Sequence, residues 1–232
     1  MKPQQEKPAT FDKYAGDYAA RIRHPIRNKF ADSGFFFERK IQILRRFFER
    51  RGMDTEKQSW LDIGCGQGDL LRYGRKYFKS AAGCDPSEGM LQACRDLDVR
   101  HQGALDTLPF DDTTFDFVTA VYVYHHVPIA RRPLLTAEAR RVLKPGGIVC
   151  IIEHNPQNPF TRLIVSGTPV DADVHLLTAG ESGHLLSSAN AQVLETRYFL
   201  LFPEWLKFAL PAEDFMAALP FGGQYAVFAE RC

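Results

Sequence analysis

The chain has 232 residues, 45% of them hydrophobic and 25% charged, and its formal net charge is +1. These values are typical of one globular domain, 1–232, and exclude a strongly basic protein that is steered to nucleic acid. The five cysteines have no close-pair spacing, so no metal site is expected. The N-terminus has no apolar signal core and the apolar runs are short, which predicts a soluble cytoplasmic protein.

The first ten residues are polar, contain proline and are expected to form a flexible tail. Apolar residues at helical spacing then predict a helix over about 35–51, which ends at Gly52. Further on, short apolar runs alternate with helical patterns. The predicted strands are 59–63, 80–84, 99–103, 115–123 and 148–154, and the predicted helices are 69–78, 87–97 and 134–143. Such alternation predicts an α/β fold with a doubly wound, mostly parallel sheet and helices on both faces.

The alternation stops after residue 154. The segment 155–177 contains three prolines and is expected to be an insertion after the fifth strand, with one short helix. Thr178 and Glu181 fit a capping box, which predicts a helix that runs toward Asn190. The last two strands are predicted over 191–202 and 224–230.

The stretch "WLDIGCGQGDL" places Gly64, Gly66 and Gly68 between a predicted strand and a predicted helix. Glycines let a ligand approach the backbone, and the start of the next helix offers free N–H groups. Asp85 ends the following strand, 19 residues beyond Gly66, where a carboxylate can accept both ribose hydroxyls of a nucleoside. Packing alone could also explain the glycines, and Asp85 could cap the helix near Ser87. The two features together favour nucleoside binding, although G-x-G-x-G differs from the G-x-G-x-x-G of dinucleotide sites.

Four motifs in this order carry a resemblance: "LDIGCGQGDL", "GCDPSEGML", "LPFDDTTFDFVTAVYVYHHV" and "EARRVLKPGGIVCIIE". They resemble the class I S-adenosylmethionine-dependent methyltransferases, in the branch that acts mostly on small molecules, and cover about residues 60–154. The N-terminal "FDKYAGDY" is similar to that family too. The resemblance implies a Rossmann-like, seven-stranded sheet whose last strand is antiparallel. It also implies S-adenosyl-L-methionine as cofactor, S-adenosylhomocysteine as product and an insertion, 155–177, that caps the acceptor side.

The same resemblance implies where the cofactor binds. Asp62 and the backbone of Gly64 and Gly66 would face its methionine part, Asp85 the ribose, Pro86 and Met90 the adenine, Gly103, Ala104 and Leu105 the adenine edge, and Val121 the amino group. The family commonly has aspartate at the position of Ala104, so a hydrogen bond to the adenine amino group is missing. Asp106 is a candidate substitute, but it is expected to face solvent.

Methyl transfer from a sulfonium needs alignment of the acceptor, and some acceptors also need a base. Candidate bases follow the fourth and fifth predicted strands, and His125 and His154 are the best of them. His126 is expected to serve packing or capping instead. From the insertion, Asp171, Asp173 and His175 could reach an acceptor hydroxyl, or they could belong to a solvated loop.

Two further groups of side chains are given structural roles. Tyr198, Phe199, Phe202, Trp205, Phe208, Phe215 and Phe221 could line an acceptor pocket or contact a membrane surface, but packing is favoured. Arg39, Lys40, Arg45, Arg46, Arg50 and Arg51 are expected to form a solvated helix face.

The sequence thus predicts methyl transfer to a small molecule, first to an oxygen of a sugar, a lipid-linked compound or a natural product. Carbon methylation of a quinone-type acceptor is the nearest alternative. A protein of this fold that binds the cofactor without transfer, and a nicotinamide dehydrogenase, stay open as well. No nucleic-acid partner and no transmembrane segment are expected, peripheral membrane contact stays open, and the oligomeric state is not predicted.

Overall fold

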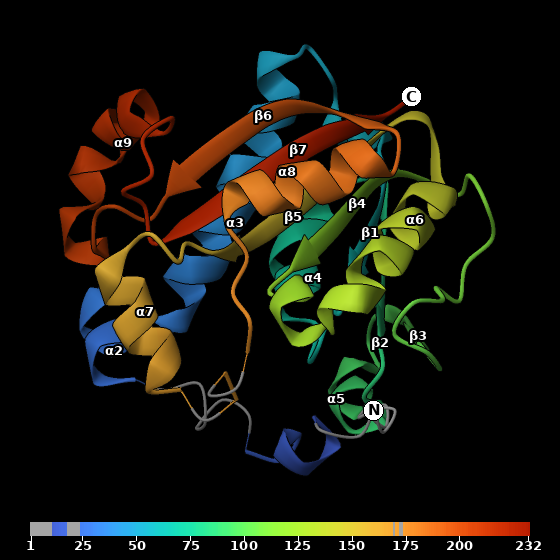
Figure 1. Cartoon of the computed structure of the whole chain (residues 1–232), viewed down its shortest axis with the longest axis horizontal. Helices are drawn as coiled ribbons and strands as arrows, with labels where there is room; N and C mark the ends of the chain where they lie inside the picture. Colours follow the sequence, from blue (N-terminus) through green and yellow to red (C-terminus); the bar gives the residue numbers. More distant parts are fainter. Residues whose placement is uncertain (1–10, 18–23, 169, 172–173) are drawn as a thin grey trace.

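The computed structural model describes residues 11–17, 24–168, 170–171 and 174–232, so the predicted tail and Asp173 lie outside the described residues. Its strands are β1 (Ser59–Ile63), β2 (Ser80–Asp85), β3 (Asp98–His101), β4 (Phe115–Val121), β5 (Leu143–His154), β6 (Ala191–Phe199) and β7 (Gln224–Arg231). They form one sheet in the order β3-β2-β1-β4-β5-β7-β6 (Figure 1). Only β7 is antiparallel to its neighbours, β5 and β6. The predicted seven-stranded, mostly parallel sheet is therefore confirmed.

Helices cover both faces of this sheet (Figure 1). The α-helices are α2 (Pro25–Phe30), α3 (Ser33–Arg50), α4 (Asp69–Gly74), α5 (Glu88–Leu91), α6 (Arg132–Val142), α7 (Pro159–Ser166), α8 (Ala179–Ser188) and α9 (Leu210–Met216). Short 3-10 helices are η2 (Asp12–Tyr14), η3 (Thr55–Lys57), η4 (Arg75–Tyr77), η5 (Gln92–Cys94), η6 (Tyr124–His126), η7 (Ile129–Arg131) and η8 (Glu204–Ala209). The buried residues of α3 and α4 pack on one face of the sheet, and those of α6 and α8 pack on the other.

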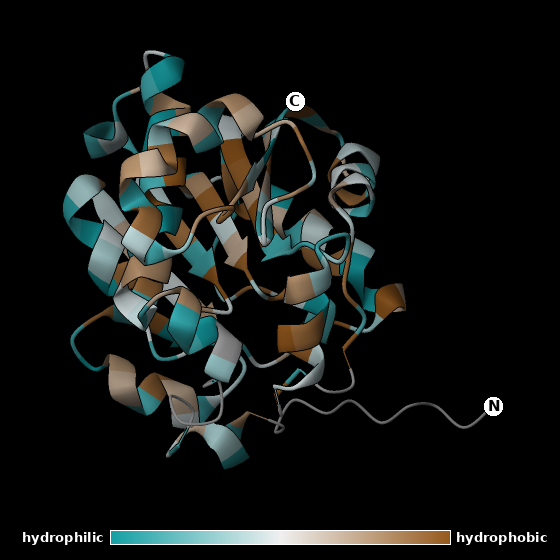
Figure 2. Ribbon diagram, turned by 90° about the vertical axis from the view of Figure 1, so that its left-hand side faces the viewer, coloured by the Kyte–Doolittle hydropathy of each residue, from teal (hydrophilic) through white to brown (hydrophobic). Residues whose placement is uncertain are grey.

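The central strands are buried on both faces, which is why their sequences are continuous apolar runs. Trp60 and Phe117 point to the core under α3, while Leu61 and Val118, their neighbours in sequence, point to the core under α6. In Figure 2 the helices carry hydrophobic and hydrophilic segments in turn, as helices with one face on a sheet do.

Helix α3 begins where Asp32 accepts a hydrogen bond from the Phe35 N–H at 2.7 Å. It packs through Phe47, whose ring stacks on that of Phe228 at 4.0 Å between centroids. The expectation of a solvated basic face is wrong for Arg39 and Lys40, which are both buried. Arg39 enters the core because it pairs with a buried carboxylate of α9, that of Glu213.

Several elements differ in length from their predictions, and for two of them a glycine gives the reason. The helix expected over 87–97 forms only α5 followed by η5, and Gly89 inside α5 is a weak helix former. Strand β5 begins five residues early, at Leu143, because Gly146 adopts a φ of +73° and the strand continues through an irregularity opposite β4.

The capping box that opens α8 is confirmed. Thr178 accepts a hydrogen bond from the Glu181 N–H at 3.2 Å, and the Glu181 carboxylate accepts one from the Thr178 N–H at 2.7 Å. Before it, the segment 155–177 contains α7, whose N-cap is Asn158. None of the helices in the described part of the chain combines the length and the apolar character needed to cross a bilayer.

Candidate functional site

A cleft with a volume of about 1650 Å³ lies at the carboxyl ends of β1, β2, β4 and β5. This exceeds the roughly 300–1,000 Å³ of a pocket for one drug-sized ligand, so a nucleoside and a second molecule have room together. Eight of the predicted cofactor residues line it: Asp62, Gly64, Gly66, Asp85, Pro86, Met90, Leu105 and Val121. Gly103 and Ala104 are not among the described residues that line the cleft.

The three glycines after β1 all have positive φ, but their surroundings differ. A Cβ on Gly64 would lie 2.5 Å from Cγ2 of Val123, and one on Gly68 would lie 2.4 Å from Cδ1 of Leu97. In contrast, no described heavy atom lies within 4 Å of a Cβ built on Gly66. Two glycines are thus required by packing, while Gly66 keeps the cleft open next to its backbone.

Asp85 connects this turn to the end of β2. Its two carboxylate oxygens accept hydrogen bonds from the N–H groups of Gly66 and Ser87, both at 2.8 Å. The hydroxyl of Ser87, and not Asp85, caps α5 by accepting from the Met90 N–H at 3.1 Å. Each carboxylate oxygen keeps a further lone pair for a ligand hydroxyl. Burial raises the pKa of Asp85, against the effect of these two hydrogen bonds.

Asp62 lies deeper, near the end of β1. Its carboxylate accepts a hydrogen bond from the Thr119 hydroxyl at 2.6 Å, and Thr119 in turn accepts one from the Trp60 indole N–H at 2.8 Å. Burial raises the pKa of Asp62 to about 7, although the bond from Thr119 opposes this shift. A cationic group in the cleft would stabilise this carboxylate.

Lys40 is a residue of the cleft that the sequence reasoning missed. Its Nζ lies 4.7 Å from the centroid of the Tyr122 ring, and burial lowers its pKa to about 7. Its position four residues from both Phe36 and Leu44, which are buried, is the signal that could have placed it on the inner face of α3.

On the acceptor side, Glu153 holds His125. The Glu153 carboxylate accepts from the His125 ring at Nδ1 (2.5 Å) and from the Tyr124 N–H (2.8 Å), and all three side chains are buried. Burial lowers the pKa of His125, but the carboxylates of Glu153 and Asp171 outweigh burial and raise it to about 9.

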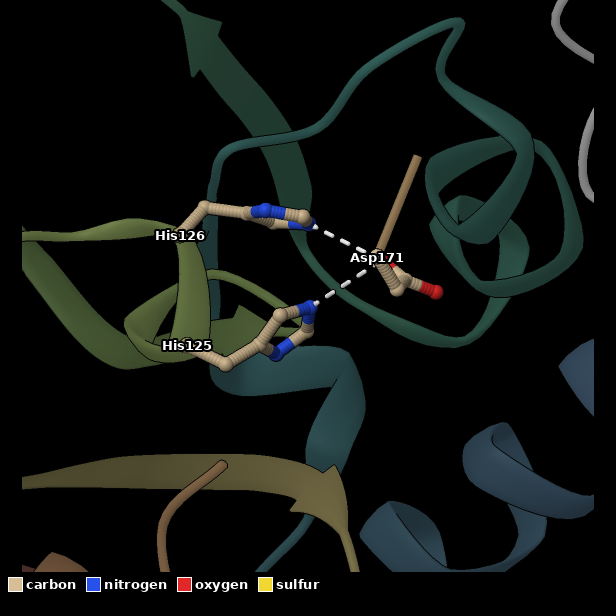
Figure 3. Close-up of side chains that lie close together, drawn as sticks. All are labelled: His125, His126 and Asp171. Atoms are coloured by element: carbon tan, nitrogen blue, oxygen red, sulfur yellow. Dashed lines mark ion pairs between the residues drawn. The ribbon is translucent and has the colours of Figure 1, made fainter. Parts of the chain in front are cut away.

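Asp171 reaches the same place from the segment between α7 and α8. Its Oδ1 lies 3.6 Å from Nε2 of His125 and 3.4 Å from Nε2 of His126 (Figure 3). His126 therefore faces the cleft, where packing or capping was expected. Burial and the neighbouring His125 lower the pKa of His126 to about 3.

His154, the other predicted base, has a different environment. Its ring stacks on that of Tyr122 at 4.2 Å between centroids, and burial and the charge of His125 lower its pKa to about 3. His175 is exposed but also lines the cleft. Of the predicted candidates, His125 is the one that a buried carboxylate orients.

One expectation about the rim of the cleft is corrected, and one further residue is found there. Asp106 does not face solvent, because it pairs with Arg131 at 2.7 Å. The buried Gln102 lines the cleft near the predicted adenine edge, and its amide donates to the Ala104 carbonyl at 2.9 Å.

Packing was expected for the seven C-terminal aromatic residues, and this is wrong for four of them. Trp205, Phe208, Phe215 and Phe221 are exposed, Phe215 with 91% of its surface. Trp205 lines the cleft, as does the exposed Phe160 of α7, so an apolar rim lies on the side of the insertion.

The order of the strands, the glycine turn and the acid at the next strand end are those of Rossmann-like folds that bind nucleosides. Residues 61–151 match the model of a methyltransferase domain. This match agrees with the resemblance to the class I S-adenosylmethionine-dependent methyltransferases that the motifs carry, and S-adenosylmethionine is the cofactor of that class.

Individual proteins that are similar in sequence to this chain are also named as methyltransferases. The chain is similar to the demethylmenaquinone methyltransferase of Symbiobacterium thermophilum, with 37% identity over 119 residues, which cover 46% of each protein. It is also similar to a tRNA (carboxymethyluridine(34)-5-O)-methyltransferase of Arabidopsis thaliana, with 33% identity over 48% of this chain and 28% of that protein. The chain thus spans about half the length of the first relative and less of the second.

Among the solved structures that share this fold, one is similar over almost the whole chain. This is a methyltransferase from Thermotoga maritima, described as a possible histamine N-methyltransferase, with a TM-score of 0.67 over 96% of this chain and 98% of that one. At 18% identity, this likeness concerns the fold alone.

Proposed function

We propose that this protein transfers the methyl group of S-adenosylmethionine to a hydroxyl-bearing small molecule with an apolar part. The observation that carries the proposal is that one cleft contains the open backbone at Gly66, the adjoining Asp85 and, further along, the cluster around His125. A nucleoside held at the first two would direct its sulfonium toward the third.

In this arrangement the predicted residues that line the cleft contact the parts of the cofactor that the resemblance implied. Asp62 and the turn at Gly64 face the methionine part, Asp85 accepts from the ribose, and Val121 lies near the amino group. Pro86, Met90 and Leu105 contact the adenine. Gln102 takes the place of the predicted contacts at Gly103 and Ala104, because its buried amide lies at that edge.

The acceptor hydroxyl binds beside His125. Its oxygen attacks the methyl carbon while the bond from carbon to sulfur breaks, and S-adenosylhomocysteine leaves with a neutral sulfur. The hydroxyl proton passes to Nε2 of His125 in its neutral form, and Glu153 positions the ring through Nδ1. Because the pKa of His125 is raised to about 9, this neutral form is a strong base but a minor species at neutral pH. His154 has a lesser part, since its ring is stacked on Tyr122.

Carbon methylation of a hydroxylated ring is the second candidate. The relatives named demethylmenaquinone methyltransferase favour it, and the apolar rim at Phe160 and Trp205 supports an apolar acceptor. Loss of a hydroxyl proton activates the neighbouring ring carbon as well as the oxygen, so both reactions use the same cluster.

The test supplies S-adenosylmethionine with a labelled methyl group and a panel of phenols, prenylated quinols, sugars and a tRNA. We expect label on an apolar hydroxylated acceptor, and NMR of the product identifies the methylated atom. His125→Ala should lower kcat about 100-fold or more. The matched variant His184→Ala, at an exposed position of α8, should not. Label on tRNA alone, or an unchanged rate in His125→Ala, would refute the proposal.

A further inference from the structure

Three side-chain atoms that commonly bind metals converge at the acceptor end of the cleft (Figure 3). Nε2 of His125 and Nε2 of His126 come from η6, and Oδ1 of Asp171 comes from the segment between α7 and α8. All three atoms lie within 4.8 Å of one another, and each residue lines the cleft. We propose that they bind a divalent transition-metal ion of the zinc type.

The spacing of these atoms supports coordination over direct contact. Asp171 Oδ1 is 3.6 Å from one imidazole nitrogen and 3.4 Å from the other. Good hydrogen bonds between such groups are about 2.7–3.2 Å long. Neighbouring ligands of a tetrahedral ion, at about 2.0–2.1 Å from the metal, lie about 3.3–3.5 Å apart. The carboxylate oxygen therefore has the separation that a shared ion requires.

The surroundings of the two imidazoles support the same conclusion. The hydrogen bond from Nδ1 of His125 to Glu153 directs Nε2 of that ring toward Asp171. Glu153 is itself fixed by the Tyr124 N–H. A carboxylate that holds the far nitrogen of a histidine is the usual outer partner of a metal-binding imidazole. The ring of His126 contacts the edge of Phe11 at 4.9 Å between centroids, which restrains its orientation as well.

The donor set also defines the kind of ion. Two imidazole nitrogens and one carboxylate oxygen suit zinc, cobalt or iron(II), whereas magnesium and calcium prefer oxygen ligands. Three protein ligands leave a fourth position for a water molecule or a substrate oxygen, as in catalytic zinc sites. The cleft supplies the access that such a position needs.

The consequence for catalysis rests on the proposed function. A hydroxyl bound at the fourth position becomes more acidic, so its proton passes to water and the oxyanion is held for attack on the methyl group. His125 then acts on the acceptor through the ion. Metal binding itself does not depend on the acceptor, so it can be tested separately.

The experiment measures zinc in the purified full-length protein. The protein is stripped with a chelator, incubated with Zn²⁺, freed of excess metal and analysed by mass spectrometry for zinc per chain. Cys232→Ser is the background, because this exposed thiol could bind zinc by itself. We expect one zinc per chain, and for Co²⁺ the visible absorption bands of a tetrahedral site. Mg²⁺ should not compete.

His126→Ala and Asp171→Asn should each weaken zinc binding about 100-fold or more. Neither side chain is fully buried, so both variants are expected to fold. The matched variant His184→Ala should retain one zinc. Binding of S-adenosylhomocysteine, followed in all variants, reports the cofactor site separately. A Cys232→Ser protein that binds S-adenosylhomocysteine but retains no zinc would overturn the metal site and leave the proposed function standing. Zinc binding in His126→Ala and Asp171→Asn as tight as in the protein without these two substitutions would do the same.

Discussion

Gly66 differs from its neighbouring glycines because the space beside it is open. Its φ is +53°, and a Cβ at this position would project into the cleft. The backbone N–H beside it donates a hydrogen bond to the Asp85 carboxylate. Gly66→Ala should therefore weaken S-adenosylhomocysteine binding at least tenfold, which isothermal titration calorimetry can measure. The added methyl group occupies the volume that the ligand needs.

Gly52 provides the matched control. It follows α3 with a φ of +66°, and no described atom lies within 4 Å of a Cβ built there. Both alanine variants should lose about 1 kcal/mol of unfolding free energy because of left-handed backbone strain. Only Gly66→Ala should lose affinity. Equal affinities in the two variants would show that strain, and not ligand space, requires glycine at position 66.

Among individual residues, position along the chain predicted Gly66 and Asp85, because the ends of parallel strands share one edge of the sheet. Asp62 was predicted from the family resemblance. The approach of Asp171 to His125 could not be predicted, since it depends on the path of the 45 residues between them. The bond of Glu153 to His125 could not be predicted either, because it required knowledge of the register of β5.

At the scale of elements, Lys40 on the inner face of helix α3 leads to a prediction about stability. This side chain is buried, and burial lowers its pKa from 10.5 to about 7. In the folded state the charged form is therefore disfavoured at neutral pH. Lys40→Met should raise the free energy of unfolding by about 1–4 kcal/mol at pH 6, because an apolar side chain of similar length replaces a buried charge.

The pH dependence has a defined sign. Below pH 7 both the folded and the unfolded protein carry the Lys40 proton, so the full penalty is present. Between pH 7 and 10.5 the unfolded chain binds more protons, and the wild-type protein gains stability as pH rises. The difference in free energy of unfolding between Lys40→Met and wild type, measured by urea titration, should shrink between pH 7 and 10.5. Lys79→Met, at an exposed position, should show no such difference, and a Lys40→Met difference that stays constant with pH would contradict the account.

Among the elements, buried strands were predicted best. Strand β1 has the predicted bounds, because its apolar residues must face both layers of helices. Strand β5 and helix α5 were predicted less well, since glycines at 146 and 89 change the backbone locally in ways that apolar periodicity does not reveal. The inner face of α3 was misjudged because Arg39 is buried only through its pairing with Glu213, 174 residues away.

Across the whole molecule, the sheet places the proposed nucleoside site and the proposed acceptor site in one cleft. The central claim is that the Asp85 carboxylate binds S-adenosylmethionine at the nucleoside site. The same carboxylate accepts a hydrogen bond from the Gly66 N–H. The alternative of a nicotinamide dehydrogenase requires that this cleft bind a dinucleotide instead, whereas a protein of this fold without transfer would bind the same cofactor.

Calorimetric titration of S-adenosylhomocysteine into wild type, Asp85→Ala and Asp98→Ala tests this claim most directly. Asp98 is an exposed acid on the neighbouring strand β3 and serves as the control. We predict one ligand per wild-type chain, an at least tenfold higher Kd (about 1.4 kcal/mol) for Asp85→Ala, and an unchanged Kd for Asp98→Ala. A folded wild-type protein without saturable binding, or an Asp85→Ala variant that binds as tightly as wild type, would contradict the account.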